Sequence, residues 1–496
     1  MKHFKRTALA SVINLALFGI PDAHADTAAL ERRIRELESR LEKLDQAGAL
    51  SSKPVAAAPE VEKLSRKVNT LERKLEVQNE ETTGTFKKLP VFEAGADGFK
   101  ISSSDKKHQV RVRGSVQGDG RFYIDDTTSR AIDKFEIKQA RIWLEGYFFK
   151  DIYFKIMPDF AASSNILPDA YLDYAYHPAA SLLVGKFKPS ISLERLQGDS
   201  DGTFLERAFP TYLAPNRDVG VQLHGAFSKP GYKAETVAGP IDTKNTFTYQ
   251  IGVTNGSGDD GSPNNNSPDT DNNKEVVGRL FAHPFHHTGY SWLEGLGFGV
   301  AGTIGNPDRQ ALKAQATPIG RTTYLDYTKT NTGFATPTSD GGQFRVYPQA
   351  YWFSGPFGAI GEYVVSSQHL VSGRTDVVQK NTAWQFQGSY VVTGEDNSFA
   401  GVKPIRNFDP LKGNWGALQL AARYSELDVD NDTFKIVDIN QSAAKAKAWT
   451  VGANWFLNSN AIIRANYENV SFARGAAGGR DLANESIFAT RFQLSF

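Results

Sequence analysis

The stretch SIFATRFQLSF, residues 486–496, decides the fold class of this chain. In an extended strand, most of its apolar side chains fall on one face and its polar side chains on the other. The first face holds Phe488, Thr490, Phe492, Leu494 and Phe496, and the second holds Ala489, Arg491, Gln493 and Ser495. A last strand with an apolar outside, a polar inside and a terminal aromatic residue is typical of outer-membrane β-barrels. We therefore expect a transmembrane barrel whose Phe496 is recognised by the barrel-assembly machinery.

The N-terminus predicts export independently. Three basic residues within the first six positions precede an apolar stretch at 7–20, and the small residues Ala23 and Ala25 form a cleavage site. This pattern predicts a signal peptide over 1–25 and a mature chain that begins at Asp26. The expected location is the outer membrane of a Gram-negative cell. The alternative is that the apolar stretch is retained as an N-terminal anchor.

The composition narrows the possible chemistry. The 496 residues include no cysteine, which excludes disulfides, thiol catalysis and cysteine-based metal sites. No segment after the signal peptide reaches the roughly 18 consecutive apolar residues of a transmembrane helix. The formal charge is +1, and removing three basic residues and Asp22 with the signal peptide leaves −1. Any ion preference must therefore come from where the charges lie rather than from their sum.

Residues 26–80 carry apolar residues at steps of three and four, with acidic and basic residues between them. The apolar positions are Leu30, Ile34, Leu37, Leu41 and Leu44, followed by Val61, Leu64, Val68, Leu71 and Leu75. A Pro- and Ala-rich linker at 47–59 separates the two runs, and a connector follows at 81–108. This spacing predicts a short periplasmic α-helical coiled coil that self-associates, because helices of this length are marginal alone. The alternative is a solitary amphipathic helix.

From residue 109 to 496 the hydrophobic period changes to two, which indicates β-strands. About 16 candidates can be counted, at 109–123, 134–149, 151–160, 168–177, 181–188, 217–227, 245–254, 274–283, 294–304, 342–353, 356–366, 382–393, 415–427, 445–457, 460–471 and 486–496. With a periplasmic N-terminus, the long connections at 255–273 and 305–341 lie outside the cell, and most of the short ones lie inside. The predicted fold is all-β, a 16-stranded antiparallel transmembrane barrel. A large soluble β-protein is the alternative.

Several short motifs recur in the order found in one known family. They are Gly185-Lys186-Phe187-Lys188-Pro189, Leu193-Glu194-Arg195, Leu205-Glu206-Arg207, Asn216-Arg217-Asp218-Val219-Gly220, Thr393-Gly394-Glu395, Phe408-Asp409-Pro410, Arg423-Tyr424 and Gly452-Ala453-Asn454-Trp455. From about Asp97 to its end the chain resembles the phosphate-selective porin O/P family. The resemblance implies a homotrimer of 16-stranded barrels in the lipid bilayer, each with a loop folded into a basic pore for phosphate-like anions. The helical segment lies outside the resemblance.

Basic residues on the inner wall are the candidates for the anion pathway, because guanidinium and ammonium groups bond phosphate oxygens. Strand parity turns Arg111, Arg113 and Arg141 inward, and Lys186 and Lys188 flank Phe187 before the connection at 189–216. We expect that connection to be the constriction loop. By the resemblance, Arg195 aligns with the lysine at the narrowest point of the family's channel, and Arg111 with a basic residue near the periplasmic exit. Structural pairing of Glu194 with Arg195 is the alternative role for that arginine. We expect Glu206 and Arg207 to form a structural pair that holds the loop.

Some positions depart from the family pattern. Gly198 and Asp199 stand where phosphate-binding members have two serines, and Ser115 replaces an arginine. Arg141 and Lys188 replace tyrosines. The basic character is thus kept, while the phosphate site is rebuilt with an aspartate that would repel a dianion.

Three functions remain open at this point. The first is a passive porin for phosphate, pyrophosphate or polyphosphate. The second is a general diffusion porin without a specific anion site, and the third is a barrel anchor whose coiled coil acts as a periplasmic spacer. No hydrolytic triad, nucleotide-binding loop or metal-binding motif is present, so we expect no enzyme activity, no cofactor and no nucleic-acid partner.

Overall fold

The computed structural model describes residues 23–49, 58–86, 89–124, 132–162, 166–235, 245–256, 271–475 and 481–496. They form two compact units, one made of the N-terminal helices and one of the sheet. Most of the predicted signal peptide lies outside the described residues. None of the described helices is both long and apolar enough to cross a membrane.

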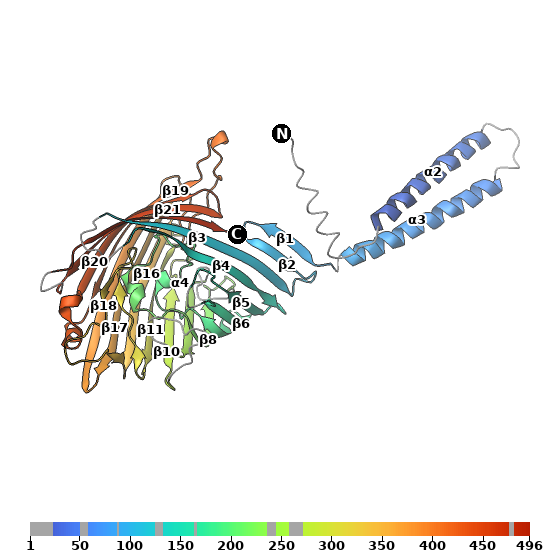
Figure 1. The fold of residues 1–496 in the computed structure, drawn as a ribbon. Helices are drawn as coiled ribbons and strands as arrows, with labels where there is room; N and C mark the ends of the chain where they lie inside the picture. The colour runs from blue at the N-terminus through green and yellow to red at the C-terminus, as the bar shows by residue number, and fades with distance from the viewer. Residues whose placement is uncertain are drawn as a thin grey trace. The chain divides into compact units, whose positions relative to one another are not determined.

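The first unit is a pair of helices in which α2 (Ala23–Ala49) contacts α3 (Ala58–Phe86). Figure 1 shows the two helices side by side. Ile34 on α2 and Val68 on α3 are each only 8% exposed, and the described leucines of the predicted apolar stripes are partly buried. Ion pairs between residues four apart, such as Arg66 with Glu62 at 2.6 Å, lie on the outer faces. The apolar stripes therefore contact each other within one chain, and a coiled coil between chains stays a prediction.

The second unit is a closed antiparallel barrel of 16 strands (Figure 1). The strands are β3 (Gln109–Tyr123), β4 (Lys134–Phe148), β5 (Ile152–Met157), β6 (Asp169–His177), β7 (Ala180–Phe187), β8 (Asp218–Phe227), β9 (Phe247–Thr254), β10 (Glu275–Ala282), β11 (Leu296–Gly305), β16 (Gln343–Ser354), β17 (Phe357–Ser372), β18 (Thr375–Val391), β19 (Ala417–Asp428), β20 (Lys445–Phe456), β21 (Ala461–Ala473) and β22 (Glu485–Ser495). Pairing of β22 with β3 closes the ring. The predicted fold class and strand number are confirmed.

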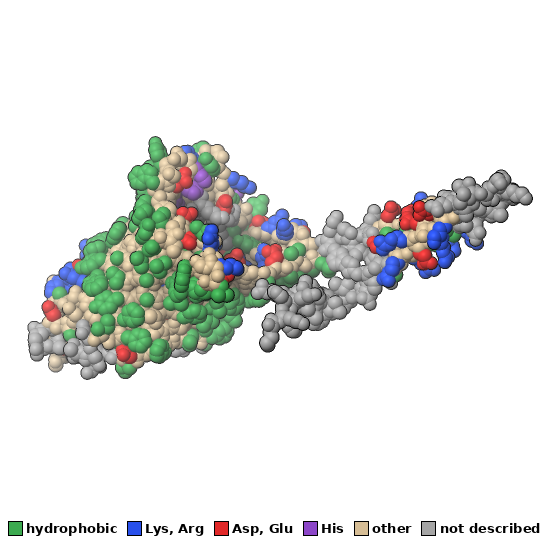
Figure 2. Space-filling model, turned by 90° about the horizontal axis from the view of Figure 1, so that it is seen from above, with side chains coloured by type: hydrophobic (Ala, Val, Ile, Leu, Met, Phe, Trp, Pro, Cys, Tyr) green, Lys and Arg blue, Asp and Glu red, His purple; other side chains and the backbone are tan. Residues whose placement is uncertain are grey.

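The wall alternates as the sequence predicts, with apolar side chains outside and polar side chains inside. On β3, Val116 is 46% exposed while its neighbour Ser115 is fully buried. On β22, Phe492 is 53% exposed and Arg491 only 3%. Figure 2 shows hydrophobic side chains spread over the outer surface of the barrel. Such an outer surface suits lipid, and the inner polar groups must pair with one another or with water.

Two parts of the wall differ from the expected strands. The hairpin β17–β18 continues to Ser372 and Thr375, well beyond the expected ends at 366 and 382. Its inner face combines polar residues, such as Gln368, which donates to Gln379 at 2.8 Å, with the buried Leu370 and Val377. Its outer face carries the exposed Asp376 and Lys380, and this polarity resembles a loop in sequence. In the predicted connector, β1 (Val91–Gly95) and β2 (Gly98–Ser102) form a hairpin, and β2 pairs with the start of β3.

Inner segments fill part of the barrel. The connection between β7 and β8 contains the short helix α4 (Leu193–Leu196) and the 3-10 helix η1 (Phe209–Leu213). The connection between β11 and β16 contains the short strands β12 (Gln310–Ala311), β13 (Gln315–Ala316), β14 (Thr323–Leu325) and β15 (Thr338–Ser339). Ile191, Phe209 and Leu325 from these connections pack in one buried apolar cluster with wall residues such as Tyr347. The main apolar core therefore lies inside the barrel, where the connections meet the wall.

Candidate functional site

The segment 188–217 lies against wall strands far from it in sequence. Gln349 on β16 donates to the Ile191 carbonyl at 2.8 Å, and the Leu205 amide donates to Asn466 on β21 at 2.8 Å. Helix α4 is fixed by Glu362 on β17, whose carboxylate accepts hydrogen bonds from the Ser192 hydroxyl at 3.0 Å and from the Glu194 amide. The segment is thus held from several sides of the barrel.

A cavity of about 180 Å³ lies between this segment and strands β3, β4 and β22. Its basic lining residues are Lys138, Arg141, Arg195, Arg207, Arg217 and Arg491, and its acidic lining residues are Glu194, Asp199 and Glu206. The lining thus contains six basic groups and three carboxylates. This basic lining marks the cavity as the candidate functional site. Three of its cations also have carboxylate partners outside the lining, Asp159, Asp169 and Asp119.

Asp199 is the centre of one cluster of charges at the cavity. Its carboxylate pairs with the guanidinium groups of Arg141 on β4 and Arg207 on the inner segment, and the Lys188 ammonium lies 3.9 Å away. Burial by itself would raise the pKa of Asp199, but the charges of Arg207, Arg141 and Lys188 outweigh it and hold the pKa well below its ordinary value. Asp199 is therefore ionised and surrounded by cations.

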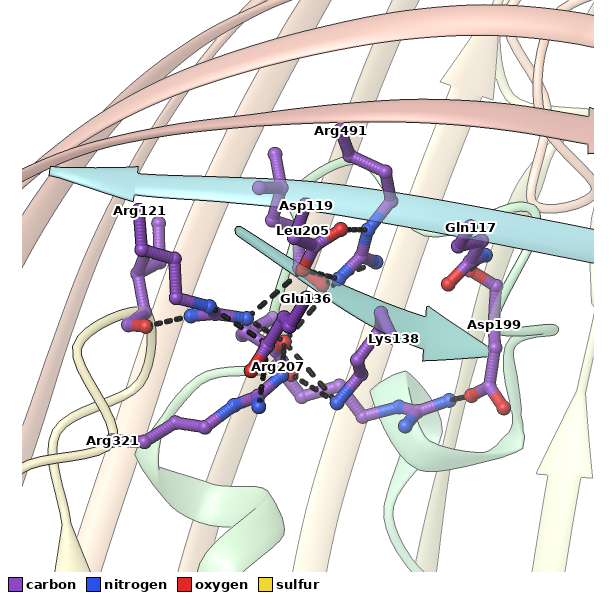
Figure 3. A network of polar contacts seen from close by, with 12 residues as sticks. Gln117, Asp119, Arg121, Glu136, Lys138, Asp199, Leu205, Arg207, Arg321 and Arg491 are labelled. Atoms are coloured by element: carbon purple, nitrogen blue, oxygen red, sulfur yellow. Dashed lines mark hydrogen bonds and ion pairs between the residues drawn. The ribbon is translucent and has the colours of Figure 1, made fainter. Parts of the chain in front are cut away.

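Glu206 is the centre of a second cluster, drawn in Figure 3. Its carboxylate pairs with Arg121 at 2.7 Å, with Lys138 and Arg491 at 3.3 Å each, and with Arg321. Burial raises the pKa of Glu206, yet these four cations lower it well below its ordinary value. Three of the cations come from the wall strands β3, β4 and β22, so Glu206 ties the inner segment to the wall.

Further carboxylates share these cations. Asp119 pairs with Arg491 at 2.6 Å and with Arg121 at 3.0 Å, and Glu136 pairs with Arg121 at 3.1 Å and Arg321 at 2.9 Å. The second cluster is consequently a network in which each arginine has more than one acidic partner.

Arg195, the first choice from sequence, lines the cavity and is 8% exposed. Its guanidinium donates to the Asn216 side chain at 2.7 Å and to the Thr211 carbonyl at 2.6 Å, while its Nε atom has no hydrogen-bond partner. Burial and the nearby Arg207 lower the pKa of Arg195 to about 10, which leaves it charged at neutral pH. Among the described residues, its charge is therefore met only by neutral oxygen atoms.

The expected pairings of sequence neighbours were wrong. Glu194 pairs with Arg423 on β19 at 3.1 Å instead of with Arg195. Glu206 pairs with the four cations of the second cluster, and Arg207 pairs with Asp199. The physical reason is that consecutive side chains leave the backbone in different directions. Glu194 and Glu206 reach wall strands. Arg195 and Arg207 contact other residues of the inner segment.

The other predicted residues lie in different places. Arg141 lines the cavity. Lys188 does not belong to the described lining, but its ammonium donates to the carbonyl of the lining residue Arg195 at 2.9 Å. Arg111 and Arg113 share the carboxylate of Glu145, at 2.8 Å and 3.4 Å, and do not belong to the described cavity lining.

Lys186 is 4% exposed and also lies outside that lining. In register it is opposite Ala170 on β6 and Val219 on β8. Together, Arg195, Arg141 and Lys188 are the predicted residues that the structure brings to one place.

Sequence reasoning missed four cations of the cavity. Arg491 belongs to the polar face of the last strand, so the alternation of side chains along that strand predicts that it points inward. Lys138 falls where the β3–β4 register shifts between Gln117 and Gly118, so simple alternation does not place it. Arg207 was considered only as a structural partner of Glu206, and Arg217, which pairs with Asp169 at 2.6 Å, appeared only within a motif.

The chain is similar to known porins and channels of outer membranes. A family model described as phosphate-selective porin O and P matches residues 110–496. Porin O of Pseudomonas aeruginosa is 22% identical over 428 residues, which cover 80% of this chain and 91% of that relative. The outer-membrane channel DcaP of Acinetobacter baumannii has a TM-score of 0.48 at 12% identity, over 82% of this chain and 100% of the other. An anion-selective porin from Comamonas acidovorans has a TM-score of 0.45 at 10% identity, over 78% and 100%.

The family match covers most of the chain and the whole barrel apart from its first residue, and the barrel it describes is a channel rather than an enzyme. The chain therefore belongs to the family of phosphate-selective porins O and P, the porins of the outer membrane.

Proposed function

We propose that this porin admits anions passively, with phosphate, pyrophosphate or polyphosphate as the permeating class, through a constriction at the basic cavity. The observation that carries the proposal is the lining of six cations and three carboxylates between the inner segment and the wall. Charge-assisted hydrogen bonds from arginine and lysine attract phosphate oxygens. Partial neutralisation by the carboxylates keeps binding weak enough for the ion to leave, as conduction requires.

Arg195 is the central residue of this proposal. Its charge meets only neutral acceptors among the described residues, so an anion in the cavity would be its first ionic partner. A buried charge without a counter-ion is costly, and binding an anion relieves that cost. Arg141 and Lys188, which lie around Asp199, would add positive potential.

The remaining basic residues would act away from the cavity. Arg111 and Arg113 divide one carboxylate, Glu145, between two guanidinium groups and keep a surplus of positive charge. They would guide anions at the periplasmic end of the pore. For Lys186 we propose a contribution to the potential of the same pathway, without direct contact in the cavity.

The proposal extends to assembly and export. The chain would be exported by the signal peptide at 1–25, inserted through recognition of Phe496, and assembled as a homotrimer. The helices α2 and α3 would lie in the periplasm. If they act as a spacer or tether, the barrel serves also as an anchor, and the pore would be unaffected by their removal.

The test is the zero-current potential of the purified porin in a planar bilayer under a KCl gradient, followed by titration with phosphate. We expect a chloride-favouring potential and block of the chloride current by phosphate, both reduced in the variant Arg195→Gln. The control is Arg309→Gln, since the Arg309 side chain is 77% exposed and does not belong to the described cavity lining. A cation-favouring potential would exclude the proposal, and anion preference without phosphate block would favour a general diffusion porin.

A further inference from the structure

Asp199 stands at the cavity in the position that an anion would be expected to take. Each oxygen of its carboxylate meets a separate guanidinium group, Arg141 at Oδ2 and Arg207 at Oδ1, with the Lys188 ammonium nearby. Two guanidinium groups and an ammonium converging on one oxyanion form an arrangement that proteins use to bind free carboxylate or phosphate. We propose that Asp199 is a tethered anion, a carboxylate of the channel itself that competes with the permeating anion for this group of three cations.

The three cations are held in place without Asp199. Arg141 donates from Nε to Asp159 at 2.7 Å, and Arg207 donates to the carbonyl oxygens of Glu194 and Gln197 at 3.1 and 3.2 Å. Lys188 donates to the Arg195 carbonyl at 2.9 Å. Because each cation has a second anchor, their arrangement persists when the Asp199 carboxylate is absent or displaced.

The backbone around Asp199 is held by hydrogen bonds from Gln117 to the Asp199 carbonyl and from Arg464 to the Ser200 carbonyl, but the segment is less buried than the chain around Glu206. Asp199 lies between Gly198 and Gly202, and residues 198–203 are all partly exposed rather than buried. Glu206, by contrast, follows Leu205, which is 3% exposed and packs in a buried cluster, and precedes the fully buried Ala208 and Phe209. The two carboxylates are equally exposed, at 16% each, so they differ in the packing of the residues that flank them. Glu206 anchors the segment, and Asp199 is a ligand that an incoming anion can replace.

The inference rests on the proposed function and makes it quantitative. The permeating anion cannot bind while the Asp199 carboxylate occupies the site. The apparent affinity for that anion is therefore the intrinsic affinity multiplied by the fraction of time that the site is vacant. If Asp199 occupies the site nine-tenths of the time, its removal lowers the phosphate concentration that half-blocks the current about tenfold. Asp199 would then set the working concentration range of the channel.

The experiment compares the half-blocking phosphate concentration of the full-length porin with that of Asp199→Asn and Asp199→Ala. We expect a decrease of about tenfold in both variants. Asp199→Glu keeps a tethered carboxylate and should remain close to the unmodified porin. The matched control is Asp201→Asn, which removes a neighbouring carboxylate of the same turn that does not belong to the described cavity lining.

A second measurement tests the vacant site directly. Formate added to Asp199→Ala should raise the half-blocking phosphate concentration back toward that of the unmodified porin, and should have no effect on the unmodified porin itself. An unchanged or higher half-blocking concentration in the variants overturns the inference and leaves the proposed function standing. Failure of both Asp199→Asn and Asp199→Ala to fold also overturns it, since the cations would then depend on Asp199. Cation preference of the unmodified porin removes the proposed function and the inference together.

Discussion

Substitution of Glu206 by glutamine tests whether ion pairing fixes the inner segment to the wall. The change keeps the shape of the side chain and removes the charge that Arg121, Lys138, Arg321 and Arg491 share. Removing one partner of a buried ion pair typically costs 3–5 kcal/mol, because the remaining charge is left uncompensated.

The structure places the expected cost at the lower end of this range. Arg121 and Arg491 keep Asp119, and Arg321 keeps Glu136. Lys138 pairs with no other described carboxylate, but its side chain is 30% exposed and water can solvate it in part. We therefore expect Glu206→Gln to lower the free energy of unfolding by about 3 kcal/mol.

The assay is urea unfolding of the porin in lipid vesicles, followed by tryptophan fluorescence and extrapolated linearly to water. The control is Glu93→Gln, which breaks the more exposed pair between Glu93 and Lys100 and should cost no more than about 1 kcal/mol. The double variant Glu206→Gln, Lys138→Met should show a coupling energy of at least about 1 kcal/mol, because it removes the unpaired charge. If the free energy of unfolding of Glu206→Gln lies within about 0.5 kcal/mol of that of the unmodified porin, the ion pairs of Glu206 do not hold the inner segment to the wall and the reasoning is wrong.

Three further outcomes are expected. The pKa of Glu206 lies well below its ordinary value of 4.5, so its contribution to stability is complete above about pH 4.5 and is lost as the pH falls through the lowered pKa. The free energies of unfolding at pH 3 and pH 7 should therefore differ less in Glu206→Gln than in the unmodified porin. Deletion of residues 26–86 should leave the single-channel conductance unchanged, since the cavity lies wholly within the barrel, and a changed conductance would assign the helices a role in the pore. Gly114→Ala places a methyl group 2.4 Å from the Phe496 ring at the closing seam and should cost about 1–3 kcal/mol in urea unfolding, whereas Gly118→Ala, with nothing within 4 Å, should cost less.

Much of the barrel could be predicted because its signal is local. Successive residues of a strand point to opposite faces, so lipid outside and polar groups inside impose a period of two on each strand separately. Strand β22 shows this directly, since Phe492 is outside and Arg491 inside. The pattern failed where polar residues lie on the outer face or where the register shifts. The extended hairpin β17–β18 is an example of the first case and Lys138 an example of the second.

The sequence by itself determined the 16-stranded barrel, the apolar stripes of the helices and the basic character of the inner wall. Only the tertiary structure decided which charges meet. Glu206 and Arg491 are 285 residues apart and come together because the β7–β8 connection crosses the interior to the strand that closes the ring. Likewise Asp199, a repulsive position when considered alone, is surrounded by three cations in the fold. Strand periodicity is fixed by neighbouring residues, whereas the electrostatics of the lumen depend on distances between segments that no local pattern records.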